Sequence, residues 1–191
     1  MQIGVMGFTK LSLGMLIVAA GTTVSMAADT AAPSFPKPAA PLSDATTALV
    51  KTWASAPLGF TKALFVKGPA SGFGQYEPRA ASAFSADEVM HVYVEPVAFG
   101  LSEAEGTYSY ALSAGFRLLN PTGQVLAENT DFARFENEAR SPRRELSTSM
   151  SFQFSGLPGG EYTLALDITD QVSEKSAEIL LPFAITSEDQ Q

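Results

Sequence analysis

The sequence contains no cysteine and only one histidine and one tryptophan among its 191 residues. Without cysteine there is no disulfide, no thiol nucleophile and no thiolate ligand for a metal. A structural zinc site needs about four ligands, mostly His or Cys, so the single His91 argues against zinc. We therefore expect no cofactor, and the fold must be stabilised by a hydrophobic core without covalent cross-links.

Basic residues are also scarce, since 12 Lys and Arg stand against 20 Asp and Glu, for a net charge of −8. Nucleic-acid phosphates need a concentrated basic face, so this balance argues against a nucleic-acid partner. It also disfavours electrostatic binding to anionic lipid. The expected partner is an envelope protein or a polysaccharide.

The first 27 residues carry one charge, Lys10, followed by an apolar run over Leu11–Ala20 and by small residues at Ser25 and Ala27. This pattern predicts a signal peptide over residues 1–27, cleaved after Ala27. The alternative is a retained membrane anchor, but the run is shorter than the roughly 20 residues of a spanning helix. We therefore expect a periplasmic or secreted protein, with membrane contact only through an uncleaved signal.

Residues 28–42 contain four prolines among alanines, which predicts an extended, semi-rigid tether. A short helix is expected over residues 43–56, capped by Ser43 or Asp44 and closed by Pro57. Its apolar residues recur on one face, at Ala45, Ala48, Leu49 and Trp53. We expect Trp53 to pin this helix to the domain that follows.

From Phe60 onward, apolar and polar residues alternate, as they do in strands with one buried face. The clearest alternating runs are Met90–Glu95, Tyr108–Leu118, Leu146–Phe154, Glu161–Ile168 and Ala177–Ile185. Turn-forming residues at 120–123 and 170–175 indicate hairpins. The sequence predicts an all-β fold, an antiparallel β-sandwich of about seven strands over residues 58–187.

The segment Leu157-Pro158-Gly159-Gly160-Glu161-Tyr162 has the form Leu-x-x-Gly-x-Tyr. It resembles the tyrosine corner of immunoglobulin-like and fibronectin type III sandwiches, in which the Tyr hydroxyl bonds to backbone a few residues upstream. The resemblance implies an Ig-like fold with Leu157, Gly160 and Tyr162 as structural residues. Such folds host many activities, so it implies no particular function.

Two groups of residues are candidates for chemistry. His91 and Glu95 share a strand face with Tyr93, and a hydrolase or polysaccharide-binding accessory domain would need them in a cleft lined by aromatics such as Tyr108. The favoured interpretation is a polar, solvent-facing strand face. No catalytic residue is therefore assigned.

Calcium needs only oxygen ligands, which Asp167, Asp170 and Glu174 could supply around the last hairpin. The spacing of an EF-hand loop is missing, and a charged turn explains the same residues. The favoured interpretation contains no metal.

Residues Asp131–Glu145 concentrate arginine and aromatic residues, as interaction surfaces do. We expect a long inter-strand loop, which either pairs its charges internally or binds a partner. The candidate partner-binding residues are Phe132, Arg134, Phe135, Arg140, Arg143 and Arg144. The function expected from the sequence is that of an exported, non-enzymatic binding module.

Overall fold

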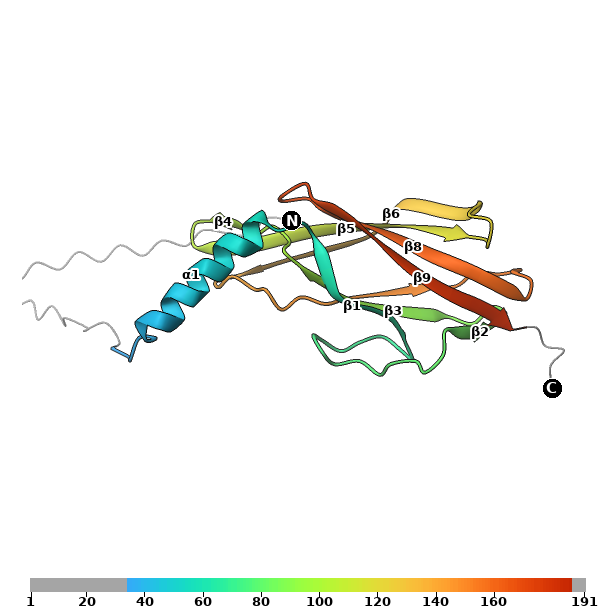
Figure 1. The fold of residues 1–191 in the computed structure, drawn as a ribbon, viewed down its shortest axis with the longest axis horizontal. Helices are drawn as coiled ribbons and strands as arrows, with labels where there is room; N and C mark the ends of the chain where they lie inside the picture. Colours follow the sequence, from blue (N-terminus) through green and yellow to red (C-terminus); the bar gives the residue numbers. More distant parts are fainter. Residues whose placement is uncertain (1–33, 187–191) are drawn as a thin grey trace, which may run out of the picture. The chain divides into compact units, whose positions relative to one another are not determined.

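The computed structural model describes residues 34–186, so the predicted signal peptide and residues 28–33 of the predicted tether lie outside the described residues. The described residues from Pro38 onward belong to one compact unit. Within the described residues, one helix precedes two β-sheets (Figure 1). The expected all-β class is confirmed.

Nine strands follow the helix α1 (Ala40–Ser55) within residues 34–186. They are β1 (Gly59–Val66), β2 (Ala83–Ser85), β3 (Met90–Val97), β4 (Ser102–Ala104), β5 (Thr107–Leu119), β6 (Val125–Ala139), β7 (Thr148–Phe152), β8 (Gly160–Asp170) and β9 (Ser176–Thr186). About seven strands are expected from the sequence. The strands β2 and β4 have three residues each, which is too short for alternation to reveal them.

The smaller sheet has the order β1-β3-β7, and the larger has the order β2-β9-β8-β5-β4 with β6 also paired to β5. Leu112 of β5 pairs with both Phe135 of β6 and Asp170 of β8, so β6 and β8 occupy opposite edges of β5. All pairings between the named strands are antiparallel except that of β2 with β9. The buried side chains of both sheets form one core cluster, which includes Val92 and Leu164.

The predicted alternation is confirmed in β8 and β9 of the larger sheet. On β8 and β9 the buried row is Tyr162, Leu164, Leu166, Ile168, Ile179, Leu181, Phe183 and Ile185. Both predicted hairpin turns are present, since the Gly123 N–H donates to the Asn120 carbonyl at 2.9 Å and the Asp170 N–H donates to the Lys175 carbonyl at 2.8 Å. Gly123 has φ 82°, which glycine adopts without strain.

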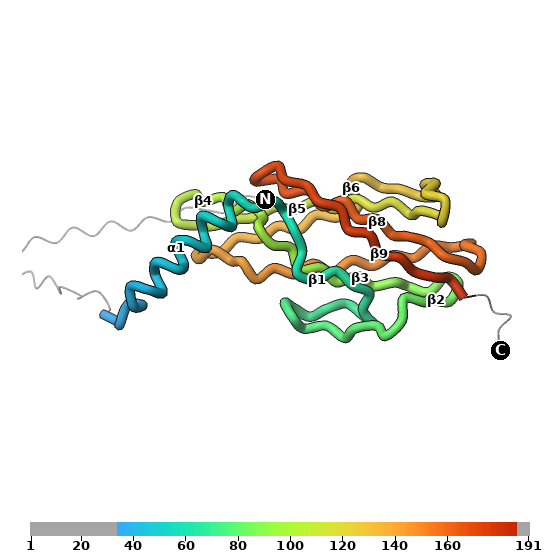
Figure 2. The backbone as a smooth tube through the Cα atoms, viewed as in Figure 1, coloured from blue at the N-terminus to red at the C-terminus, as the bar shows by residue number. Residues whose placement is uncertain are grey.

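Two of the three residues of the predicted solvent face of β3, Tyr93 and Glu95, are instead buried, whereas His91 is half-buried. Tyr93 is 0% exposed and Glu95 is 5% exposed. The segment 68–77 between β1 and β2 folds beside β1 and β3 (Figure 2). Its Gly74 N–H donates to the Tyr93 hydroxyl at 2.7 Å, and the Tyr76 ring stacks on the Tyr93 ring at 4.2 Å. A distant segment therefore supplies the cover that the local sequence pattern does not reveal.

The expected long loop at Asp131–Glu145 is wrong for most of its length. Residues 131–139 belong to β6, and only residues 140–147 connect β6 to β7. The charged run can form a strand because β5 supplies the backbone hydrogen bonds along one edge of β6. Its charged side chains lie on the exposed surface, where charge protects a sheet edge from unwanted pairing.

The helix begins three residues earlier than expected, at Ala40, so Pro41 lies in its first turn and not in the tether. The first turn tolerates proline because its N–H groups have no partner within the helix. No side chain caps the start, so the expected caps Ser43 and Asp44 are wrong. The helix ends at Ser55, and the extended Ala56 precedes Pro57.

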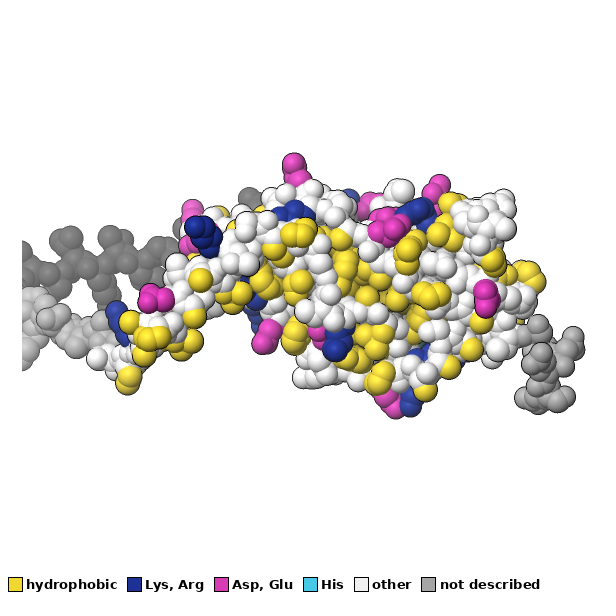
Figure 3. All heavy atoms as spheres, in the orientation of Figure 1, with side chains coloured by type: hydrophobic (Ala, Val, Ile, Leu, Met, Phe, Trp, Pro, Cys, Tyr) yellow, Lys and Arg dark blue, Asp and Glu magenta, His cyan; other side chains and the backbone are white. Residues whose placement is uncertain are grey.

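Much of the apolar surface of α1 is open to solvent. Leu42, Leu49 and Val50 are 60%, 49% and 45% exposed, and hydrophobic side chains are visible along the helix in Figure 3. Of the expected apolar face, Trp53 packs against the core of the domain. No helix within residues 34–186 combines the length and apolar character needed to cross a membrane.

Candidate functional site

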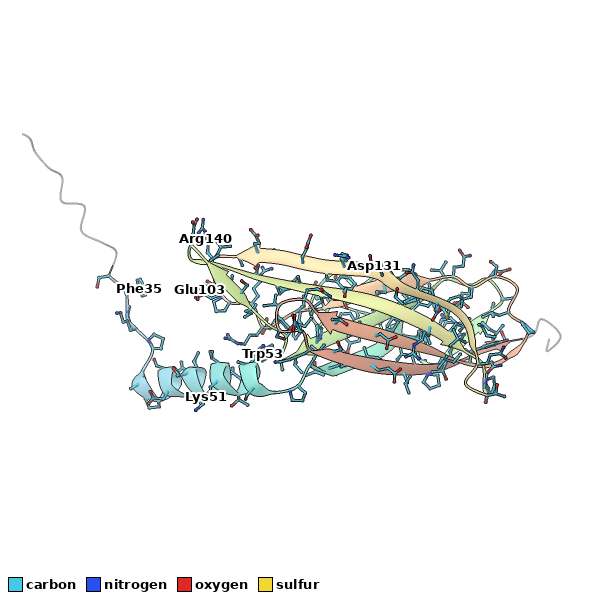
Figure 4. All side chains as sticks on the ribbon, turned by 90° about the horizontal axis from the view of Figure 1, so that it is seen from above. Phe35, Lys51, Trp53, Glu103, Asp131 and Arg140 are labelled. Atoms are coloured by element: carbon cyan, nitrogen blue, oxygen red, sulfur yellow. The ribbon has the colours of Figure 1, made fainter. Side chains whose placement is uncertain are left out.

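Three of the six predicted binding residues lie on β6, away from the connection that holds the other three. Phe132 points into the core, where its ring stacks on Phe152 at a centroid distance of 4.8 Å. Phe135 is half-buried and packs against the same core. Arg134 is exposed on β6 and pairs with Asp131 at 3.2 Å. Figure 4 shows Asp131 along β6, well away from Arg140.

The other three arginines lie together in the connection between β6 and β7. Arg140 is exposed and donates from Nη1 to the Glu105 carbonyl at 3.3 Å. The guanidinium carbon of Arg144 lies 5.9 Å from the centre of the Trp53 ring, within cation–π distance. The Nε atom of Arg144 is buried and has no hydrogen-bond partner among the described residues. Arg144 is therefore the candidate ligand-binding group of this connection.

Arg144 and Trp53 line a hollow of about 540 Å³, which is open to solvent at the end of the sheets where α1 joins them. We call it the α1 hollow. Figure 4 shows Trp53 and Glu103 at this end of the molecule. Its lining includes Trp53, Phe99, Leu101, Glu103, Tyr108 and Arg144. The volume is typical of small-molecule sites.

Two contacts hold the end of α1 against the domain beside this hollow. The Trp53 indole N–H donates to the Phe99 carbonyl at 2.7 Å, and the two rings meet edge to face at 5.3 Å. The Lys175 ammonium donates to the Ala54 carbonyl at 3.0 Å and to the Ala98 carbonyl at 2.9 Å. The expectation that Trp53 pins the helix to the domain is confirmed.

The carboxylate of Asp170 supports the floor of the hollow. Asp170 is 0% exposed and accepts hydrogen bonds from the Gly100 N–H, the Val172 N–H and the Ser173 hydroxyl. Gly100 must be glycine here, because an added Cβ would lie 2.9 Å from the Val172 side chain. Sequence reasoning placed Asp170 in a turn but gave no sign of its burial.

The three residues considered for calcium do not come together. Asp167 is exposed and pairs with Arg117 at 3.1 Å, whereas Asp170 bonds to the hairpin that it begins. The described part of the chain contains no group of three or more His, Cys, Asp or Glu side chains arranged to hold a metal. The charged-turn interpretation accounts for the positions of these residues.

Two tyrosines at the same end of the larger sheet have raised pKa values. The hydrogen-bonded Glu103 carboxylate is the main cause of the raised pKa of Tyr108. Burial is the main cause of the raised pKa of Tyr110, and the charge of Arg143 opposes it. Both phenols are therefore neutral at ordinary pH, and Tyr108, which lines the hollow, presents a hydroxyl group and not a phenolate.

The possible acid–base pair of β3 is not arranged for catalysis in a cleft. Glu95 is buried and accepts hydrogen bonds from the Thr61 and Tyr93 hydroxyls, each at 2.8 Å. His91 Nδ1 shares a hydrogen bond with the Ser151 hydroxyl at 2.8 Å. The hydrolase hypothesis needs an acid open to substrate, and Glu95 does not supply one.

We expect the substitution Tyr93→Phe to lower the free energy of unfolding by about 2 kcal/mol at pH 7, since Gly74 loses an acceptor and Glu95 loses a donor. Burial is the main cause that raises the pKa of Tyr93, so the contribution of the neutral hydroxyl is fully present below the ordinary pKa. This contribution is lost as the pH rises through the raised pKa of Tyr93 in the folded protein. The difference in the free energy of unfolding between wild type and Tyr93→Phe should therefore narrow above about pH 10.

Urea unfolding at pH 7 and at about pH 10.5 measures both effects of this substitution. Tyr76→Phe is the matched control, because it keeps the stacked ring and leaves the Tyr93 hydroxyl in place. An equal loss of stability in the two variants would contradict the assigned role of the Tyr93 hydroxyl.

Comparison with known proteins gives neither a family nor a function for this chain. No protein-family model matches the chain, and no curated protein matches its sequence. The class that the described residues define is therefore an all-β protein of two sheets with an N-terminal helix and a hollow beside that helix.

Proposed function

We propose that this chain is an exported, non-enzymatic β-sandwich binding module of the cell envelope, with its partner site at the α1 hollow. The observation that carries the proposal is the buried Nε of Arg144, which has no partner among the described residues and lies beside the Trp53 ring. A buried donor without an acceptor costs about 1–3 kcal/mol. Because Nε itself is covered, a partner in the hollow interacts with the part of the Arg144 side chain that lines it.

A second hollow supports a surface that extends across the connection. It measures about 560 Å³ and is lined by Phe73, Pro142, Arg143, Arg144 and Glu145. Pro142 and Arg144 line both hollows, so the two are neighbours on either side of one segment. Phe73 is 43% exposed there. Exposed aromatic and arginine side chains are the residue types that contribute most to protein interfaces.

The Ig-like form of the sandwich is supported by one hydrogen bond. The Tyr162 hydroxyl donates to the Pro158 carbonyl at 2.9 Å, four residues upstream, as in a tyrosine corner. Gly160 has φ 156°, which residues with a Cβ rarely adopt, at the start of the same strand. Export is supported by the sequence pattern of residues 1–27.

A crosslinking capture from native envelope tests the binding function. The bait is the chain from Ala28, compared with an Arg140/Arg143/Arg144→Ala variant. A second variant, Lys37/Lys62/Lys67→Ala, removes the same amount of charge from exposed sites outside both hollows. We expect one partner to be captured by wild type and by the second variant, and to be lost at least tenfold from the first, or about 1.4 kcal/mol.

Equal capture by all three proteins would contradict this location of the site. Capture of no partner by the wild-type chain, together with a monomer in solution, would contradict the proposed function itself.

A further inference from the structure

Building on the binding function above, we propose that the α1 hollow binds a carboxylate attached to an apolar ring. The juxtaposition that supports this ligand class is one arginine without a partner beside aromatic and aliphatic walls. Arginine presents a planar fork of donors that matches a carboxylate.

The hollow offers one cationic group to a ligand. Lys175 also lines it, but the Lys175 ammonium already donates to two backbone carbonyls. Arg144 forms none of the ion pairs found within residues 34–186. The charged side chains of the lining therefore fit a ligand with one anionic group, bound at Arg144.

The walls of the α1 hollow fit a ligand whose remaining part is apolar. The Trp53 indole N–H is already bonded to Phe99, so this side chain presents its ring surface and not a donor. Leu101 and Val172 add aliphatic surface to the lining. Aromatic rings gain about 0.5–1.5 kcal/mol from edge-to-face or offset contact beyond the area that they bury. A ring-bearing ligand uses this surface better than an open chain does.

A neutral sugar and a cation both fit less well. A sugar needs many free donors and acceptors, but the Ser173 hydroxyl is bonded to Asp170 and the Lys175 ammonium is bonded to backbone. A cation would face Arg144, and the one carboxylate of the lining, Glu103, acts on the Tyr108 hydroxyl, whose pKa it raises. The carboxylate is therefore the ligand class that meets the unsatisfied group.

The test uses 4-phenylbutyrate as the probe and the fluorescence of Trp53, which is the only tryptophan in the chain and lines the hollow. For a ligand of this size we expect saturable binding with a Kd of about 1 mM. The isosteric controls 4-phenylbutanol and 4-phenylbutylamine, and the neutral disaccharide cellobiose, should bind at least about tenfold more weakly.

Substitutions test whether 4-phenylbutyrate binds at Arg144. Arg144→Ala should weaken 4-phenylbutyrate at least about tenfold, and Arg144→Lys should recover part of that loss. Lys62→Ala is the matched control, because Lys62 is an exposed cation on β1 and does not line the hollow. A thermal midpoint within about 2 °C of wild type identifies the variants in which the fold is intact.

Equal binding of the alcohol, tighter binding of the amine or of cellobiose, or unchanged affinity in a folded Arg144→Ala would each overturn the ligand class. Failure of 4-phenylbutyrate to saturate the Trp53 signal by about 10 mM would overturn it as well. The envelope capture is independent of these results, so a captured partner with no carboxylate binding would retain the binding function and reject the ligand class.

Discussion

Replacing Asp170 by alanine is expected to lower the free energy of unfolding by about 3 kcal/mol, one of the two largest effects that we predict. The carboxylate is 0% exposed and accepts from two backbone N–H groups and one hydroxyl. Alanine removes all three acceptor contacts and leaves the Gly100 and Val172 N–H groups without this partner. A buried donor that loses its acceptor retains the full cost of desolvation.

Asp167→Ala is the matched control for Asp170→Ala, because Asp167 is on the same strand and is exposed. Its pair with Arg117 is a surface ion pair, so we expect a loss of no more than about 1 kcal/mol. Denaturant unfolding followed by circular dichroism gives both values. Losses of equal size would show that Asp170 does not organise the β8–β9 turn.

The second large effect is expected for Phe152→Ala, which should cost about 4 kcal/mol. Phe152, on β7 of the smaller sheet, is 3% exposed and packs against aromatic rings of the larger sheet. Its ring centre is 4.8 Å from that of Phe132 on β6 and 5.4 Å from that of Phe116 on β5. Alanine leaves a cavity that the surrounding strands can close only in part.

The control for the core is Leu180→Ala, since Leu180 is 56% exposed on β9 and should cost about 0.5 kcal/mol. Thermal and urea unfolding of the two variants measure the difference. Phe132→Ala should resemble Phe152→Ala and not Leu180→Ala, because Phe132 contacts the same rings. A Phe132→Ala variant with wild-type stability would return this residue to the surface, where the sequence interpretation placed it.

Local patterns were sufficient to predict the strands that bury one face. On β8 and β9 the buried row follows directly from alternation, because neighbouring side chains of a strand point to opposite faces. The turns at 120–123 and 170–175 could be predicted for the same reason, since Pro, Gly and Asp favour turn conformations within a few residues. Such features depend on residues that are close in sequence.

The elements for which the prediction from sequence was wrong, β3 and β6, depend on contacts between residues that are distant in sequence. The second face of β3 is buried because the segment 68–77 covers it, and β6 is a strand because β5 lies beside it. Neither neighbour is visible from the local pattern of polarity. For the same reason Phe132 resembled a surface aromatic among charges, although its ring packs into the core.

The residues of the candidate site also fall into those that the sequence indicated and those that only the structure revealed. Its arginines were found from the composition of the connection, because clustered Arg is itself a sequence signal. The participation of Trp53, Phe99 and Lys175 was not predicted, since they come from α1, the segment after β3 and the last hairpin. No local pattern relates three such separated positions.

The sequence by itself determined the all-β class, the strands β8 and β9 with their buried rows, the two hairpin turns and the role of Trp53 in attaching the helix. Only the tertiary structure decided which arginine lacks a partner, which carboxylates are buried and where a hollow remains. Turn propensity and the alternation of apolar and polar residues depend only on residues that are close in sequence. Burial and hydrogen-bond pairing depend on which distant segments meet, and that is settled when the two sheets and α1 pack together.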